Sequence, residues 1–376
     1  MRINLIQVRL FHMLKKWPTR HRIVFLCALF LFWISGVRFA ISLGSGTSFH
    51  NDATSESFSI FSANHYLDHG LFEHHLLPTY PGFGHGPDGK RRTEPFVYNH
   101  YLPGPDFVLV AALKTFGRDA VLVARLVPHT LTVLAMAAVS VEFGVLMGST
   151  WRALLMLAML FIPRSLTAWS TCVYGHSYVM AFYLFMVTGV LRLARSSKQY
   201  TGVQVISFGF LIGALQMFFE LDWMPLTFVS ACSLFLVFES VPAAQARRFL
   251  VGLVAGAVAV LTYQLVISSI EFGSLDWVIK NIQQWVRFRN GTDVVPEMTV
   301  GDLRLHKVLA EYNRQAYGST GMTAYNWMIF GAVFVALGYL GKVYSAKRAQ
   351  RLIAAIAVSF LAAASFPLPY YLVYWD

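Results

Sequence analysis

The sequence predicts an all-α polytopic membrane protein, with about nine transmembrane helices and a long first outer loop that contains interfacial helices. Of its 376 residues, 56% are hydrophobic and only 13% are charged, whereas soluble proteins carry about 25% charged residues. Several apolar runs also approach the roughly 20 residues that a helix needs to cross a bilayer. We expect a single membrane domain over residues 1–376.

The net charge of +11 does not indicate nucleic-acid binding, because the cationic residues fall in short clusters between apolar runs. That pattern is typical of cytoplasmic turns in membrane proteins. The three cysteines, Cys27, Cys172 and Cys232, are too far apart for a metal motif or a disulfide framework. Membrane lipids are therefore the expected surroundings, and no nucleic-acid partner is expected.

The basic segment Met1–Arg22 predicts a cytoplasmic N-terminus (residues 1–22) in a cell (inner) membrane. The apolar run that follows, Ile23–Leu43, lacks a convincing cleavage site, so we interpret it as an uncleaved first membrane helix. The segment 44–119 then forms the first outer loop. Within it, Phe107–Phe116 is apolar but too short to cross the bilayer, which predicts a helix lying in the outer interface.

The remaining apolar runs predict eight further membrane helices. The helix beginning at Trp151 is expected to be short or broken at Pro163, and a second outer loop is expected over residues 271–325. The predicted spans are Ala120–Met147, Trp151–Ile162, His176–Leu193, Val203–Phe219, Trp223–Phe238, Phe249–Ile270, Asn326–Leu340 and Leu352–Val373.

Seven of the twelve histidines lie in the polar stretch between Leu43 and Pro105, which makes the first outer loop the expected place for chemistry. Asp52 follows the first membrane helix closely. A carboxylate at this boundary can act as a general base or can cap a helix over Ser57–Leu67, and the two roles are compatible. Glu56 lies one turn further on and either holds a second ligand or faces water. Taken alone, the residue is better interpreted as facing water.

His65 and His69 have the i, i+4 spacing of a metal pair, and Glu73 lies one turn beyond. No HExxH-type signature accompanies them, so solvated or pH-sensitive histidines are the preferred interpretation. We expect no cofactor and no metal ligands, and a divalent metal stays open as the alternative.

Several charged residues are candidates for substrate binding. The run Lys90-Arg91-Arg92 and Arg164 could clamp a phosphate; for the run, a solvated turn is the competing interpretation. Glu220 and Asp222 lie between two predicted helices, and acids at membrane depth usually serve a function, although at the surface they would only form a turn.

Three sequence features together resemble a known family. They are Asp52 after the first membrane helix, the run His100-Tyr101-Leu102-Pro103-Gly104-Pro105, and the pair of motifs Lys114-Thr115-Phe116-Gly117 and Ala124-Arg125-Leu126. This arrangement resembles the integral-membrane GT-C glycosyltransferases, in particular the protein mannosyltransferase and aminoarabinose transferase branch. The similarity covers about residues 23–150.

The resemblance implies an inverting transfer of a sugar from a polyprenyl-phosphate donor to a lipid, glycan or protein acceptor on the non-cytoplasmic side. It implies Asp52 as the general base, while an alternative alignment places Glu56 at that position. His100 and Tyr101 are expected among the substrate-binding residues. The interfacial helix over Phe107–Phe116 would border a groove for the lipid tail.

Two other classes of function stay open. A transporter or flippase would favour inverted repeats, interrupted helices and buried charges, and a non-catalytic GT-C-like subunit of an envelope-assembly complex would share the fold without the activity. The incomplete acidic motif, in which Asp52 is followed by Ala53, is compatible with the latter.

Overall fold

The computed structural model describes most of the N-terminal three quarters of the chain. The described residues are 14–44, 53–81, 95–97, 102–161, 170–196, 199–220, 224–238, 240–276 and 278–280. The two membrane helices predicted over Asn326–Leu340 and Leu352–Val373 lie outside these residues, as does most of the predicted outer loop 271–325.

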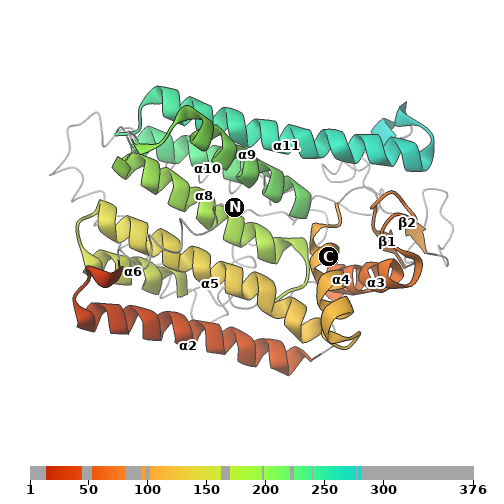
Figure 1. Ribbon diagram of the computed structural model, residues 1–376, viewed down its shortest axis with the longest axis horizontal. Coiled ribbons are helices and arrows are strands. Elements are labelled where there is room, and N and C mark those ends of the chain that lie inside the picture. Colours follow the sequence, from red (N-terminus) through yellow and green to blue (C-terminus); the bar gives the residue numbers. More distant parts are fainter. Residues whose placement is uncertain are drawn as a thin grey trace, which may run out of the picture.

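Five described helices are long and apolar enough to cross a membrane, and they run side by side (Figure 1). This agrees with the predicted all-α polytopic membrane protein, and each helix corresponds to one predicted span. Two shorter apolar helices, α6 (Thr150–Phe161) and α10 (Met224–Val237), occupy the places of two further predicted spans. The five long helices are α2 (Thr19–Leu43), α5 (Val121–Leu146), α8 (Gly175–Ser196), α9 (Gly202–Phe219) and α11 (Ala243–Phe272).

Local sequence signals set several of the helix ends. Thr201 and Gln204 form a capping box at the start of α9, in which each side chain accepts a hydrogen bond from the backbone N–H of the other. Pro242 precedes the first residue of α11, and Gly273 ends that helix with a φ of 68°, a conformation that glycine adopts without steric cost.

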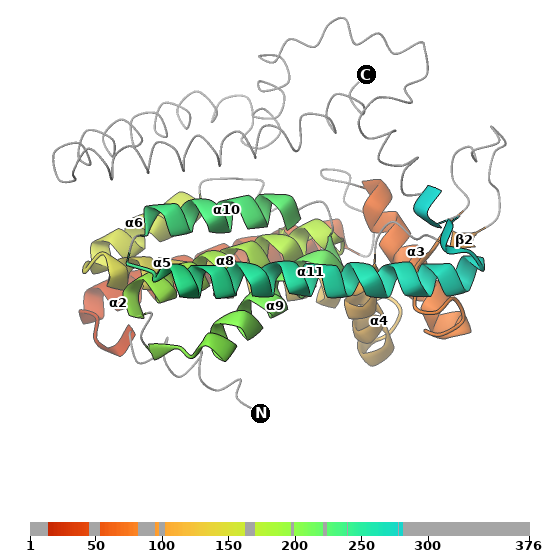
Figure 2. The same ribbon diagram turned by 90° about the horizontal axis from the view of Figure 1, so that it is seen from above.

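One end of the bundle carries the described part of the first predicted outer loop (Figures 1 and 2). It consists of α3 (Ala53–His69), α4 (Gly104–Phe116) and two short antiparallel strands, β1 (Thr79–Tyr80) and β2 (Phe96–Val97). With 13 residues, α4 is about 20 Å long and too short to cross a bilayer core of about 30 Å. We call this the α3–α4 end, and the other the opposite end.

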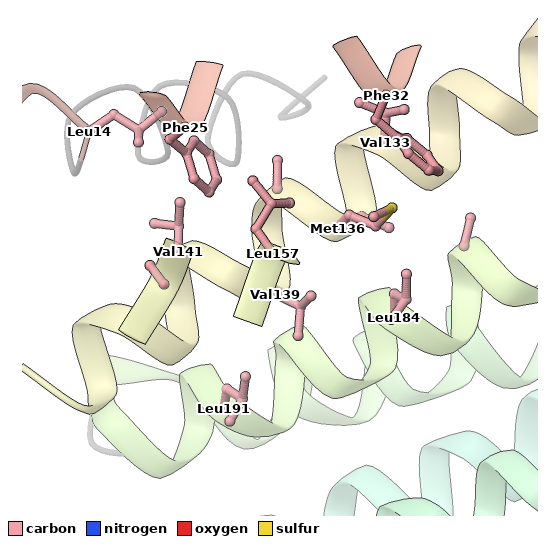
Figure 3. Close-up of a cluster of buried hydrophobic side chains, with 14 of the residues drawn as sticks. Leu14, Phe25, Phe32, Val133, Met136, Val139, Val141, Leu157, Leu184 and Leu191 are labelled. Atoms are coloured by element: carbon pink, nitrogen blue, oxygen red, sulfur yellow. The ribbon is translucent and has the colours of Figure 1, made fainter. Parts of the chain in front are cut away.

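The largest apolar core joins α2, α5, α6 and α8 (Figure 3). Phe25 and Phe32 extend from α2 toward Met136 of α5 and Leu157 of α6, and Phe32 stacks on Phe161 with ring centroids 4.9 Å apart. In contrast, one side of α2 leaves large apolar side chains such as Phe30 and Leu31 exposed, as expected for a helix that faces lipid.

A second contact region joins α9 and α11 through four glycines, two on each helix with GxxxG spacing. A Cβ atom at Gly209 or Gly213 would overlap the backbone of α11, and one at Gly252 or Gly256 would overlap the backbone of α9. The glycines thus allow the two backbones to touch, which is the usual role of small residues in membrane helix pairs. The pattern is present in the sequence but did not enter the prediction of the spans.

Charged residues separate along the bundle. At the opposite end, buried Glu142 of α5 pairs with Arg192 at 2.7 Å and with Arg195 at 3.3 Å, both on α8. The N-terminal ends of α2 and α11 also lie at the opposite end (Figure 1). The charged side chains there are basic, and include Arg22 and Arg247. Most of the described acids instead lie on or near the α3–α4 end: Glu56, Asp68, Glu73, Asp106, Asp119, Glu220, Glu271 and Asp276.

Candidate active site at the α3–α4 end

A fully buried ion pair joins the first turns of α3 and α5. Arg125 donates from Nη1 to Glu56 Oε1 at 2.7 Å and from Nη2 to Glu56 Oε2 at 3.2 Å. The backbone N–H of Val173 also donates to Glu56 Oε1 at 3.1 Å, and Arg125 Nη1 donates to the carbonyl oxygen of Thr171 at 3.2 Å. Both side chains are 0% exposed, so the expectation that Glu56 faces water is wrong.

The cause of that error is long-range. An acid in the first turn of a polar helix normally faces solvent, but here the Arg125 side chain of α5 and the segment before α8 reach it. Glu56 therefore meets a guanidinium that is 69 residues away in the chain. Both oxygens of Glu56 are hydrogen-bonded, so Glu56 is suited to fixing the position of α3. To accept a proton from a substrate, Glu56 would first have to break these bonds.

Apolar packing supports the ion pair. Ala63 and Tyr66 of α3 pack with Leu109 and Leu113 of α4, and the same cluster includes Val121, Ala124 and Val173. Leu109 and Leu113 are almost completely buried in this contact. The side of α4 that bears them is therefore filled by protein, and any lipid groove along α4 has to use another side of the helix.

Asp106 is a buried acid that the sequence analysis did not single out. It lies in the first turn of α4, is 3% exposed, and faces Ser59 and Ser62 of α3. Burial raises the pKa of Asp106 to about 7, although the two serine hydroxyls act in the opposite direction. The charge of Asp106 also contributes to raising the pKa of Tyr66, behind the larger effect of burial. The sequence signal was an acid in the sequence Pro-Gly-Pro-Asp that opens an apolar helix.

The raised pKa of Asp106 predicts a pH-dependent stability. The unfolded chain releases this proton near the ordinary aspartate pKa, whereas the folded chain holds it up to about pH 7. The folded state therefore binds more protons between about pH 4 and 7, and the free energy of unfolding falls across that window, by about 1.4 kcal/mol for each unit of pKa shift. Asp106→Asn should flatten this dependence. Thermal unfolding of the purified variant and wild type from pH 5 to 8 measures it, and equal slopes would contradict the assignment.

The C-terminal end of α9 is the meeting point of α4 and α8. Glu220, directly after α9, is 1% exposed, and its Oε2 atom lies 3.0 Å from His176 Nδ1 on the first turn of α8. A Cβ atom at Gly175 would come within 2.6 Å of Glu220 Oε2, and one at Gly104 within 2.7 Å of the Phe218 carbonyl oxygen. Gly104, in the Pro-Gly-Pro run, is therefore required because α4 contacts the backbone of α9 at this position.

His129 of α5 is a buried histidine within the helical bundle. Its Nδ1 atom lies 2.8 Å from Ser170 Oγ, and its Nε2 atom lies 3.2 Å from the carbonyl oxygen of Trp33. Gly36 leaves room for the imidazole, because a Cβ atom there would overlap the ring. His129 therefore links α2, α5 and the segment before α8.

The predicted histidine group also assembles. His65, His69 and Glu73 come together at the C-terminal end of α3, joined by His74, which the metal prediction did not include. Burial and the neighbouring His69 lower the pKa of His65.

Of the ten predicted catalytic and substrate-binding residues, Glu56 and Glu220 are described, and both lie at the α3–α4 end. The described helices bracket several of the others: α3 begins one residue after Asp52, and α4 begins three residues after Tyr101. The predicted residues outside the described part of the chain are Asp52, Lys90, Arg91, Arg92, His100, Tyr101, Arg164 and Asp222.

A comparison with models of known protein families found no match for this chain, and searches of curated proteins and of solved structures found none either.

Proposed function

We propose that the chain is an inverting glycosyltransferase of the GT-C type, which moves a sugar from a polyprenyl-phosphate donor to an acceptor hydroxyl. One observation carries the proposal. The described helices that adjoin the three features of the resemblance pack together, because the buried Glu56–Arg125 pair joins the helix after Asp52 to the helix that contains Ala124-Arg125-Leu126. The helix that follows the Pro-Gly-Pro run, α4, packs into the same contact.

The proposal gives the two acids different roles. Asp52 is the general base, and Glu56 positions the helix that starts beside it. The acceptor oxygen attacks the anomeric carbon of the donor while the carboxylate of Asp52 takes the hydroxyl proton. The bond from the anomeric carbon to the phosphate oxygen breaks, and its electron pair leaves with polyprenyl phosphate. Phosphate is a good leaving group, so stabilising its charge is enough.

The charge of the departing phosphate is assigned to the cationic residues Lys90, Arg91, Arg92 and Arg164. His100, Tyr101, Glu220 and Asp222 are assigned to the donor and acceptor sugars. Among the described residues, Glu220 supports a sugar site at the α3–α4 end. Its buried carboxylate is held by His176, close to the N-terminal end of α4. The acceptor is a lipid, a glycan or a protein.

The proposal places the α3–α4 end on the non-cytoplasmic side of a cell (inner) membrane, with the N-terminus in the cytoplasm. The separation of charge supports this orientation, because most described acids lie toward the α3–α4 end while the starts of α2 and α11 are basic. Basic turns are retained on the cytoplasmic side during insertion.

Asp52→Asn is the test of the base. Asparagine keeps the shape and the helix-capping ability of aspartate but cannot accept the proton, so turnover should fall by about 10²–10⁴-fold while the protein remains folded. The purified chain is supplied with a panel of radiolabelled polyprenyl-phosphate sugars and with cell membranes as the source of acceptors. Release of polyprenyl phosphate is then measured.

Asp68→Asn is the matched control, because Asp68 is an exposed aspartate on α3 that pairs with Arg118. It should retain wild-type turnover. Full activity of Asp52→Asn would show that Asp52 is not the base. A wild-type chain that releases no polyprenyl phosphate with any donor would favour the non-catalytic subunit, and transbilayer movement of a labelled donor without cleavage would favour the flippase.

A further inference from the structure

We propose that His65, Glu73 and His74 form a zinc-binding site that fastens the C-terminal end of α3 to the C-terminal end of α11. The proposal is independent of the glycosyltransferase activity and concerns a different group of residues. It rests on the positions of the donor atoms, on a buried nitrogen, and on a carboxylate that orients one of the histidines.

The donor atoms lie close together, and one pair already has the separation that a zinc site needs. His65, Glu73 and His74 each offer one ligand atom, and these atoms lie within 4.8 Å of one another. His65 Nε2 is 3.2 Å from Glu73 Oε2. Two ligands at neighbouring corners of a tetrahedral zinc site are about 3.3 Å apart, since zinc lies about 2.0–2.1 Å from each. His65 and Glu73 therefore already fit the site, and the ligand atom of His74 would move closer to them on binding the ion.

One nitrogen of His65 is shielded from solvent beside a carboxylate. The Nε2 atom of His65 is shielded, and Glu73 Oε2 lies 3.2 Å from it. A polar atom that is withdrawn from water is stable only with a partner. A cation between His65 and Glu73 would be a partner for both groups.

His74 has the supporting contact that metal-binding histidines usually have. Its Nδ1 atom lies 2.9 Å from Glu271 Oε1 at the end of α11, which leaves its Nε2 atom available for the ion. The other oxygen of Glu271 lies 2.8 Å from His75 Nδ1. A carboxylate behind a ligating histidine fixes the ring and makes it a stronger donor. Through this contact the site would join α3 to α11, which are far apart in the sequence.

The backbone after His74 also shows a constraint. His75 and Leu76 have φ values of 52° and 70°, a region that residues other than glycine rarely adopt. Such a conformation persists only where surrounding contacts hold it. The bonds of Glu271 to both histidines are such contacts, and a bound ion would add another at His74.

The donor set indicates the ion. Two imidazoles and one carboxylate are common zinc ligands, whereas Mg²⁺ and Ca²⁺ prefer oxygen ligands alone. His69 also lies near this group, with its Nδ1 atom 3.7 Å from Glu73 Oε1.

Zinc content and thermal stability of the full chain test the site. The protein is purified in detergent with an affinity tag that lacks histidine, stripped with EDTA, and titrated with Zn²⁺ or with excess Mg²⁺. We expect about one tightly bound zinc for each chain and a higher Tm with Zn²⁺ but not with Mg²⁺. The double variant with His65→Asn and His74→Asn should lose both effects. Glu271→Gln, which leaves all three proposed ligands in place, should weaken zinc binding by about 10–100-fold.

His21→Asn is the control, because His21 lies at the opposite end of the bundle and contacts Thr150. It should bind zinc as the wild type does. If the double variant fails to fold, the wild-type titration and Glu271→Gln still decide the question. A wild-type chain that retains no zinc after dialysis, or a Glu271→Gln variant with unchanged affinity, would overturn the proposal.

Discussion

Glu56→Gln should lower the free energy of unfolding by about 3–5 kcal/mol. The amount of folded protein should therefore fall sharply. The substitution removes the carboxylate that pairs with the fully buried guanidinium of Arg125, and it also weakens the bond from the Val173 N–H. Because domains are stable by only about 5–15 kcal/mol, a loss of this size is visible as a lower Tm and as aggregation in detergent.

Size-exclusion chromatography and thermal unfolding of the purified variant measure this effect. Asp68→Asn, which removes an exposed partner of Arg118 on the same helix, should change stability by no more than about 1 kcal/mol. Combining Glu56→Met with Arg125→Leu should recover much of the stability, since removing both charges leaves none unpaired. A Glu56→Gln variant as stable as the wild type, but inactive, would instead support Glu56 as the catalytic base.

Gly213→Leu should separate α9 from α11 and prevent the native bundle from forming. A Cβ atom at this position already overlaps the carbonyl oxygen of Leu253, and a backbone atom of a packed helix cannot move aside as a side chain can. Even a modest excess of volume in a packed contact costs about 1–3 kcal/mol, and here the whole side chain would have to be accommodated between two helices.

Gly202→Leu provides the matched control in the same helix. The nearest atoms to a Cβ at Gly202 belong to the flexible side chain of Arg248, so this variant should accumulate as folded protein. Protection of α9 and α11 against hydrogen exchange in detergent distinguishes the two variants. Normal protection in Gly213→Leu would mean that the two helices do not meet in the register of Gly213 and Leu253.

The long helices were predictable because each depends on its own segment of sequence. A helix in lipid must satisfy its backbone internally and expose apolar side chains, so its composition reveals its length. The predicted span Ala120–Met147 differs from α5 by one residue at each end, and the short helix α6 lies where a short or broken helix was predicted from Trp151, although Pro163 itself is outside the described residues. A short helix, α4, is also present where the interfacial helix was predicted, although it begins three residues earlier.

The candidate site was less predictable because its contacts join distant segments. Neither Glu56 nor Arg125 carries a local signal for the other, and the contact of His74 with Glu271 spans 197 residues. The burial of Asp106 likewise depends on α3 covering the start of α4. The glycine pairs of α9 and α11 are different: their spacing was readable in the sequence, and only the partner helix required the structure.

The ion pair between α3 and α5 also bears on the order of events during biosynthesis. Glu56 leaves the ribosome 69 residues before Arg125, and Val173, which completes its contacts, follows later still. Until then the guanidinium of Arg125 and the N–H of Val173, which hold Glu56 in the folded chain, have not been made. The α3–α4 end can therefore close over Glu56 only after α5 and the start of α8 have been translated. A chain stalled before residue 125 would present this carboxylate to water, where chaperones and proteases can reach α3.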